Sequence, residues 1–299
     1  MTMHLAHLSP KDWEHRGLRR TLAGHEIFTI DLPARGEEVL EPLLVIHGYP
    51  TSSYDYVEVI DGLTEHRRVV LLDLLGYGLS DKPDLAYTLA TQADIVVELT
   101  EQLELDRLSL LTHDMGDTVG GELLARHLDG EWPVEIVRRF VTNGSIYIEM
   151  AQLTAGQQFL LALPDEILPA DSAPDRLGLA AALTATLAPG NQAGVDTLAH
   201  ADLIVAGGGN RLLARIIRYI EERRRHERRY TGAIESHPSP MHIIWGTEDP
   251  IAVAAMATRL HDARPDSTLT WIDGAGHYPQ LEAAGPFVTA VAAAAPITQ

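Results

Sequence analysis

The stretch LLTHDMGDTVG at residues 110–120 determines how the rest of the sequence can be interpreted. An apolar run at residues 108–111 leads into it as a strand would, and residues 117–127 continue as a helix would. Asp114 lies in the turn between them, and Gly116 follows two residues later. A sharp strand-to-helix turn exposes one side chain and needs small residues, because backbone segments approach closely there. The pattern therefore predicts that Asp114 is a nucleophile at the end of a strand.

The residue type at this turn indicates the chemistry. The common form of such turns is G-x-S-x-G, in which serine is the nucleophile. Here Thr112 occupies the position of the first glycine and Asp114 that of the serine. A carboxylate attacks an electrophilic sp3 carbon and forms an alkyl ester, which water must then hydrolyse. The sequence therefore favours a hydrolase that works through an ester intermediate.

The composition narrows the class of protein. The chain has 299 residues, enough for a large core, and its formal net charge of −19 argues against nucleic acid or an anionic membrane as a partner. It has no cysteine and therefore no disulfide, which suits the cytoplasm, where we expect the protein to be located. Residues 1–11 lack the pattern of a signal peptide, and no apolar run is long enough to span a bilayer.

Apolar runs alternate with helical spacers along much of the chain. Residues 17–31 have the pattern of a short hairpin. The later runs are those at residues 43–46, 69–72, 108–111, 137–141, 241–245 and 269–272. Continuous apolar runs are typical of strands buried on both faces, and helical spacers imply crossover connections. The sequence therefore predicts an α/β fold with a mostly parallel sheet.

The alternation of strands and helices stops between about residues 145 and 235. This stretch has no strand-like run and is predicted to form helices at residues 154–163, 175–187, 191–205 and 211–230. We expect residues 1–145 and 236–299 to form the core, and residues 146–235 to form an inserted helical cap. The cap should cover the C-terminal ends of the strands, where ligands of open α/β sheets bind.

A carboxylate nucleophile needs a base to activate water, an acid to orient that base, and backbone donors for the oxyanion. His277 lies in a glycine-rich turn after the last predicted strand, and Asp249 follows the strand before it. We predict that His277 is the base and that Asp249 orients it, with Glu248 as the alternative acid. The backbone N–H groups of Tyr49 and Met115 are the predicted oxyanion donors, because both residues follow strand ends that should face the nucleophile.

Five short motifs follow one another at predicted strand ends: HGYP at residues 47–50, DLLGYGLSDKP at 73–83, HDMG at 113–116, GTEDP at 246–250 and GHY at 276–278. Together they resemble the α/β-hydrolase superfamily, in the branch with an Asp nucleophile that contains epoxide hydrolases and haloalkane dehalogenases. The segments at residues 50–55, 113–119, 142–144 and 277–282 are also similar to the mesoderm-specific transcript family. The resemblance implies an α/β-hydrolase fold with an inserted helical cap.

Two departures from these families distinguish the dehalogenase from the epoxide hydrolase. Haloalkane dehalogenases hold the leaving halide with N–H donors, typically a Trp just after the nucleophile and an Asn or second Trp elsewhere. Here Met115 follows the nucleophile, and Tyr49 occupies the position of the Asn. The Met side chain has no N–H donor. A departing halide would be poorly solvated, so the sequence favours the epoxide hydrolase.

Epoxide hydrolases use cap tyrosines whose O–H groups donate to the ring oxygen as it leaves. The predicted cap contains Tyr147, Tyr219 and Tyr230. Tyr147 follows the strand that leads into the cap, and Tyr219 lies on a long predicted helix. The resemblance therefore implies Tyr147 and Tyr219 as the residues that contact the substrate.

We predict a hydrolase without cofactor that opens epoxides to vicinal diols through an ester on Asp114, with a small apolar or amphipathic substrate and water as partners. Haloalkane dehalogenation is the alternative reaction, and a ligand-binding, non-catalytic member of the fold is the alternative of another class. We find no metal-ligand spacing, and we interpret the arginine-rich run at residues 223–229 as a solvated helix face with interleaved Glu. The sequence predicts no metal, nucleic acid or membrane partner and does not indicate the oligomeric state.

Overall fold

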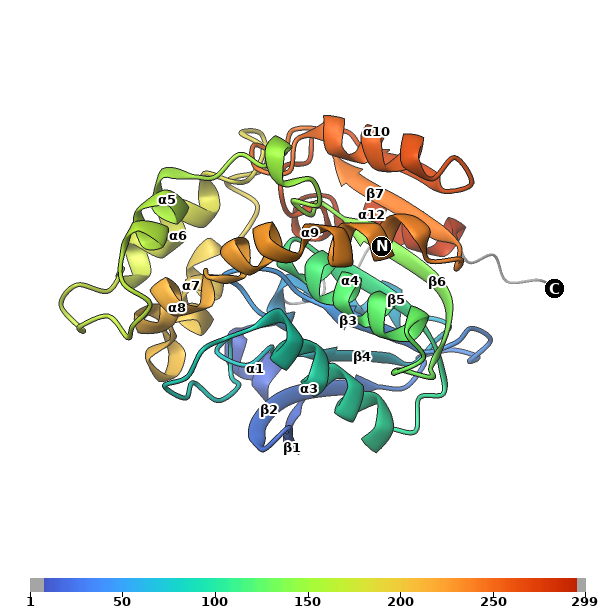
Figure 1. Cartoon of the computed structure of the whole chain (residues 1–299), viewed down its shortest axis with the longest axis horizontal. Helices are drawn as coiled ribbons and strands as arrows, with labels where there is room; N and C mark the ends of the chain where they lie inside the picture. The colour runs from blue at the N-terminus through green and yellow to red at the C-terminus, as the bar shows by residue number, and fades with distance from the viewer. Residues whose placement is uncertain (1–7, 295–299) are drawn as a thin grey trace, which may run out of the picture.

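The strand-to-helix turn at Asp114 belongs to a single eight-stranded sheet. The computed structural model describes residues 8–294, and Figure 1 shows the sheet among its helices. The strands are β1 (Leu18–Leu22), β2 (His25–Leu32), β3 (Leu43–Ile46), β4 (Val69–Leu72), β5 (Arg107–His113), β6 (Glu135–Thr142), β7 (Met241–Gly246) and β8 (Thr268–Ile272). Their order is β1-β2-β4-β3-β5-β6-β7-β8. β1–β2 and β2–β4 pair antiparallel, and the remaining neighbours are parallel, as the sequence predicts.

The apolar runs form the central strands because helices cover both faces of the sheet. All four residues of β3 are buried, and so are all four of β4. Successive side chains of a strand point to opposite faces. Leu44 and Ile46 pack in one hydrophobic cluster, while Leu43 and Val45 pack in a second. A strand with polar residues at alternate positions would leave one of these cores unfilled.

The helices outside the segment between β6 and β7 form the two covering layers. They are α1 (Pro10–Glu14), η1 (Ser53–Tyr56), α2 (Ile60–Leu63), α3 (Leu89–Gln102), α4 (Met115–Leu128), α10 (Ala254–Ala263), α11 (Pro279–Glu282) and α12 (Ala284–Ala293). α3 and α4 contribute Leu99 and Leu123 to the first cluster, and α1 and α12 contribute Trp13 and Phe287 to the second. The helical spacer between β3 and β4 is not continuous and consists of η1 and α2.

The chain between β6 and β7 is helical throughout its regular structure. It contains η2 (Ile148–Met150), α5 (Ala155–Ala162), α6 (Arg176–Thr184), α7 (Thr197–Val205), η3 (Ala206–Leu212), α8 (Leu213–Ile216) and α9 (Tyr219–Ser236). Figure 1 shows α5, α6, α7 and α8 grouped on one side of the molecule. The expected helix at 191–205 begins only at Thr197, and the expected helix at 211–230 is divided between α8 and α9. The proposed limits of a cap at residues 146 and 235 stay a prediction.

Helix α9 connects this segment to the core. Its C-terminal half packs beside α4, where Arg229 pairs with Glu122 at 2.5 Å and with Asp129 at 3.0 Å. Its first turns contain the buried Tyr219 and Arg223. One helix therefore runs from the sheet layer to the edge at which Asp114 lies. Within residues 8–294, no helix is both long enough and apolar enough to span a membrane.

Candidate active site

Asp114 occupies a strained position at the junction of β5 and α4. Its backbone angles are φ 50° and ψ −117°, in a region that residues with a side chain rarely adopt. A Cβ added to Gly116 would lie 2.5 Å from the carbonyl oxygen of Ile46, so α4 can approach β3 only because this residue is glycine. The strain holds the Asp114 carboxylate at the C-terminal end of β5, where the side chain is 4% exposed.

Thr112 takes the position of the first glycine of the common elbow without disrupting the turn. It is buried, and its Oγ1 donates a hydrogen bond to the carboxylate of Asp117 in the first turn of α4. Burial raises the pKa of Asp117 well above its usual range, while the bond from Thr112 acts in the opposite direction. Thr112 thus supplies a hydrogen bond to one oxygen of the buried Asp117, while the other oxygen has no partner in the described part of the chain.

The structure brings His277 and Asp249 together beside Asp114. His277 Nδ1 lies 2.8 Å from Asp249 Oδ2, and His277 Nε2 lies 3.8 Å from Asp114 Oδ1. His277 follows the end of β8 and Asp249 follows the end of β7, and both side chains are buried. The alternative acid, Glu248, is exposed. The three residues therefore have the arrangement of a catalytic triad, with Asp114 in the position of the nucleophile, His277 in that of the base and Asp249 in that of the orienting acid.

Asp249 is held by donors that the sequence did not reveal. Asn143 Nδ2 donates to Asp249 Oδ2 at 2.7 Å, and the backbone N–H groups of Ile251 and Ala252 donate to Oδ1 at 2.7 and 3.0 Å. Asn143 Oδ1 in turn accepts the N–H of Gly246 at 3.0 Å. Asn143 has φ 45°, a conformation that Asn tolerates better than most residues. The sequence could have indicated Asn143 only through its position directly after β6, at the same end of the parallel strands as the nucleophile.

The electrostatics of His277 depend on its two carboxylate neighbours. Burial by itself lowers the pKa of His277, but the charge and hydrogen bond of Asp249, together with the charges of Asp114 and Glu282, raise it to about 9. The resting imidazole is therefore protonated near neutral pH. Formation of an ester on Asp114 removes one of these negative charges, so the pKa of His277 falls when its function as a base begins.

The two oxygens of Asp114 have different environments. Oδ2 accepts the backbone N–H of Tyr49 at 2.8 Å. Met115 is the first residue of α4, so its N–H has no acceptor within the helix and is available at the same turn. Oδ1 is the oxygen on the side of His277. Oδ2 is therefore placed as the future oxyanion, and Oδ1 is the oxygen that can attack.

Three buried tyrosines surround this carboxylate. The rings of Tyr49 and Tyr219 lie 5.6 Å apart between centroids, and the Tyr77 O–H donates to the sulfur of Met115 at 3.2 Å. Burial, followed by the charge of Asp114, raises the pKa of Tyr49 and of Tyr219, so both phenols stay protonated. Among residues 8–294, neither of these two O–H groups has a hydrogen-bond partner. In the sequence, Tyr77 was noted only as part of the motif at residues 73–83.

The structure does not bring Tyr147 to the nucleophile. Its O–H donates to Glu235 Oε1 at 2.7 Å, and the Arg259 guanidinium stacks over its ring at 3.8 Å. Tyr230 is likewise engaged, because its O–H donates to Glu222 at 3.2 Å. The expectation for Tyr147 rested on its position after β6 alone, and the direction of its side chain depends on how α9 and α10 pack around it. Tyr147 therefore has no place in the proposed reaction.

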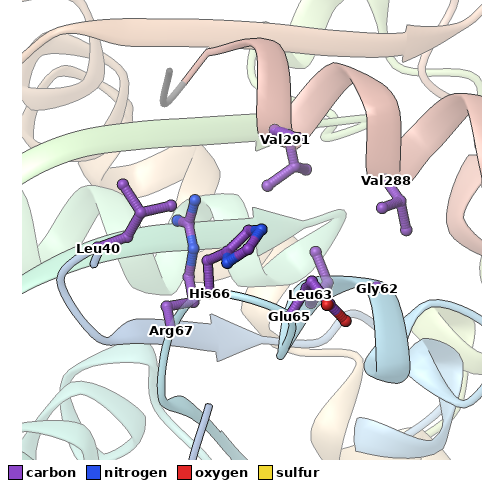
Figure 2. A pocket seen from close by; sticks show the side chains of 9 residues that line it. Leu40, Gly62, Leu63, Glu65, His66, Arg67, Val288 and Val291 are labelled. Atoms are coloured by element: carbon purple, nitrogen blue, oxygen red, sulfur yellow. The ribbon is translucent and has the colours of Figure 1, made fainter. Parts of the chain in front are cut away.

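A cavity of about 270 Å³ lies elsewhere, between α2 and α12 (Figure 2). It adjoins Arg67, two residues before β4 begins, and so lies at the opposite edge of the parallel sheet from Asp114. Its lining also includes Leu40, Leu63, His66, Val288 and Val291. This cavity is separate from the triad. In the described part of the chain, no group of three His, Cys, Asp or Glu side chains could hold a metal ion.

Comparison with known proteins shows the family to which the fold belongs. Residues 41–284 match the model of the family described as the alpha/beta hydrolase fold. The chain belongs to this family. Solved structures with the same fold include a hydrolase from Pseudomonas aeruginosa, with a TM-score of 0.73, 21% identity and coverage of 93% of this chain and 97% of that one. An enol-lactonase from Burkholderia xenovorans has a TM-score of 0.72 and 19% identity, over 91% and 97% of the two chains.

Closer sequence relatives cover most of the chain. The mesoderm-specific transcript protein of Mus musculus is 33% identical over 288 residues, which are 92% of this chain and 85% of that protein. A Mycobacterium tuberculosis protein named as the hydrolase LipZ is 36% identical over 243 residues, 81% and 83% of the two chains. A haloalkane dehalogenase of Agrobacterium fabrum is 35% identical over 106 residues, 33% of this chain and 35% of that enzyme. The relation to the mesoderm-specific transcript proteins confirms the resemblance found in the sequence motifs.

Proposed function

We propose that this protein is an epoxide hydrolase that needs no cofactor and forms a covalent ester on Asp114. Two features of the site carry the proposal together. Asp114 Oδ1 accepts no hydrogen bond in the described part of the chain, and the O–H groups of the buried Tyr49 and Tyr219 have no protein partner there. The nucleophile attacks carbon, and the tyrosines can donate to the oxygen that leaves it. Met115 and Tyr49 stand where a haloalkane dehalogenase has N–H donors, which favours an oxygen leaving group over a halide.

In the first step Asp114 Oδ1 attacks a ring carbon while the C–O bond to the ring oxygen breaks. The oxygen takes the proton of Tyr219 or Tyr49, which leaves a hydroxyalkyl ester and a tyrosinate. Because burial and the charge of Asp114 raise the pKa of both phenols, each is present as a donor before the reaction. Neutralisation of Asp114 in the ester reduces the negative charge around the tyrosinate that forms.

Once Asp114 is neutral in the ester, the protonated His277 gives its proton to the tyrosinate. In the second step the neutral His277 removes a proton from water, and the hydroxide attacks the carbonyl carbon of the Asp114 ester. The carbonyl oxygen is Oδ2, which the N–H groups of Tyr49 and Met115 stabilise as it becomes an oxyanion. Collapse expels the diol oxygen, which receives the proton held by His277. The proton left on the Asp114 carboxyl then returns to His277, so that epoxide and water become diol with no net change in the enzyme.

Haloalkane dehalogenation is the second candidate, because it uses the same nucleophile and a dehalogenase matches a third of the chain. In that reaction the carbon–halogen bond breaks as Asp114 attacks, and the tyrosine O–H groups would have to solvate the halide. A non-catalytic binding protein of the same fold is the third candidate. The triad geometry argues against it, because a binding pocket has no need of a buried His–Asp pair beside a strained carboxylate.

The test is the intact mass of the His277→Gln variant after incubation with a mixed panel of epoxides and, separately, of haloalkanes. Without its base the enzyme should form the ester and stall. We expect an added mass equal to a whole epoxide, on the peptide that contains Asp114. A mass equal to an alkyl group without halogen would instead establish the dehalogenase. The double variant His277→Gln with Asp114→Ala is the control and should gain nothing. No adduct from either panel on a folded protein would contradict both reactions.

A further inference from the structure

Arg223 differs from the other arginines around it on α9. Arg225 is exposed and pairs with Glu221 at 3.6 Å, and Arg229 pairs with Glu122 and Asp129. Arg223 is 2% exposed, and its Nε and Nη1 atoms are buried without a hydrogen-bond partner. It makes no ion pair with the residues that the structure describes. The solvated helix face expected at residues 223–229 is therefore interrupted by one buried, unpaired guanidinium.

Such a group is costly, because a buried charge loses its hydration and each unmet donor loses a hydrogen bond. The charge of Arg223 acts on Asp117, whose pKa burial raises well above its usual range, and the two side chains form no ion pair in the described part of the chain. The interior thus contains a permanently charged guanidinium with two nitrogen atoms, Nε and Nη1, that have no hydrogen-bond acceptor. An anionic group brought by a ligand would balance this charge and accept a hydrogen bond from one of the two atoms.

The position of Arg223 places this charge beside the nucleophile. Tyr219 and Arg223 are one helical turn apart and share a face of α9. The Arg223 guanidinium lies 5.5 Å from the centre of the Tyr219 ring, and the Tyr219 ring lies 5.6 Å from that of Tyr49. The backbone N–H of Tyr49 contacts Asp114. A chain of contacts through Tyr49 and Tyr219 therefore connects the Asp114 carboxylate with Arg223.

We infer that Arg223 binds a carboxylate of the substrate, so that the physiological substrate is an epoxy carboxylate rather than a neutral epoxide. This inference rests on the proposed function, because it assigns the substrate class of the same site. A carboxylate fits better than a phosphate for a reason of charge. A single guanidinium balances one negative charge, and a second charge on the ligand would be repelled by Asp114. The carboxylate binds at Arg223, and the epoxide carbon faces Asp114 Oδ1.

The first experiment measures the rate of adduct formation on His277→Gln with matched pairs of probes. Oxirane-2-carboxylate and its longer homologues, in which methylene groups separate the ring from the carboxylate, are each compared with the corresponding primary amide. We expect at least one carboxylate to react about tenfold faster than its amide, a typical effect of one charge-assisted hydrogen bond. Replacing Arg223 by Gln should abolish this preference, while Arg225→Gln, on the exposed side of the same helix, should keep it.

A second experiment needs no chemistry and so separates the two proposals. The melting temperature of the unmodified protein is measured with propanoate and with propanamide at equal ionic strength. We expect propanoate alone to stabilise the protein, Arg223→Gln to lose the effect and Arg223→Lys, which keeps the charge, to retain part of it. Stabilisation by propanoate without adducts would retain the carboxylate site and overturn the epoxide chemistry. Equal behaviour of acid and amide in both experiments, or a carboxylate preference that survives in Arg223→Gln, would overturn the inference.

Discussion

The two sides of the candidate site are built in different ways. On the core side, Asp114, Asp249 and His277 follow strand ends. The carboxylates of Asp114 and Asp249 accept hydrogen bonds from backbone and side-chain donors at 2.7–3.0 Å. On the side of α9, Tyr219 and Arg223 are also buried, and the Nε and Nη1 atoms of Arg223 have no protein partner. The Asp114 and Asp249 carboxylates therefore already have their donors, whereas on the side of α9 we propose that a ligand supplies the partner of Arg223. Substitutions on the two sides should therefore slow different steps of the reaction.

The largest effect is expected at the nucleophile. Asp114→Ala removes the proposed nucleophile, so turnover should fall by at least about 10⁴-fold. Steady-state diol formation measures the loss. Because Asp114 also contributes to the raised pKa of His277, the variant should in addition show an apparent histidine pKa below that of the unmodified protein. Activity within tenfold of the original would place the nucleophile elsewhere.

Tyr219→Phe should affect the first step alone. Loss of the O–H that donates to the leaving oxygen should slow ester formation by roughly tenfold to a hundredfold, since a hydrogen bond to a developing charge contributes about 1.5–3 kcal/mol. Rapid mixing that follows ester formation and ester hydrolysis separately is the measurement. Tyr147→Phe is the matched control, because its O–H is bound to Glu235, and it should leave both steps unchanged. An equal loss in the two tyrosine variants would contradict the placement of Tyr219.

Asn143→Gly should slow the second step by about tenfold, because Asp249 loses one donor and orients His277 less firmly. Glycine is chosen because φ at this position is 45° and alanine would add strain. A purely structural role would lower stability without altering the pH profile of ester hydrolysis. A positioning role should raise the apparent pKa of His277, since Asp249 would then direct more of its charge toward the imidazole.

The smallest expected effect is on the pH dependence of stability. His277 has a pKa of about 9 in the folded protein and about 6.5 when unfolded. Its protonation therefore contributes stability that is fully present below about pH 6.5 and is lost as the pH rises through about 9, by a few kcal/mol at most. The unfolding free energy of the unmodified protein should fall faster over this window than that of His277→Gln. Parallel curves would show that Asp249 and Asp114 do not raise the pKa of this histidine.

Much of the core side could be predicted from the sequence because its signals are local. The apolar runs of β3, β4 and β5 mark strands buried on both faces, and the turn at Asp114 follows one of them directly. The order of Asp114, Asp249 and His277 along the chain then suggests the triad. Asn143 was missed because a single Asn after a strand does not form a recognisable motif. Its role depends on a hydrogen bond to Asp249, which is more than 100 positions away in the sequence.

The helical side could not be predicted to the same depth. Which tyrosine faces the nucleophile depends on the angles at which helices pack, and Tyr147 and Tyr219 are indistinguishable by sequence spacing. Arg223 was hidden within an arginine-rich run whose other members are mostly exposed or paired with acids. Its burial follows from the packing of α9 beside α4, which no periodicity in the sequence specifies.

The most direct test of the central claim is a single turnover of the unmodified protein in water labelled with oxygen-18, with enzyme in excess over an epoxide that it accepts. If Asp114 forms an ester that water then hydrolyses at its carbonyl carbon, the label must appear in the peptide that contains Asp114. The first diol must then contain only the unlabelled carboxylate oxygen. Label in the diol with none in the peptide would mean that water attacks the epoxide directly, and the role of Asp114 as nucleophile would be refuted.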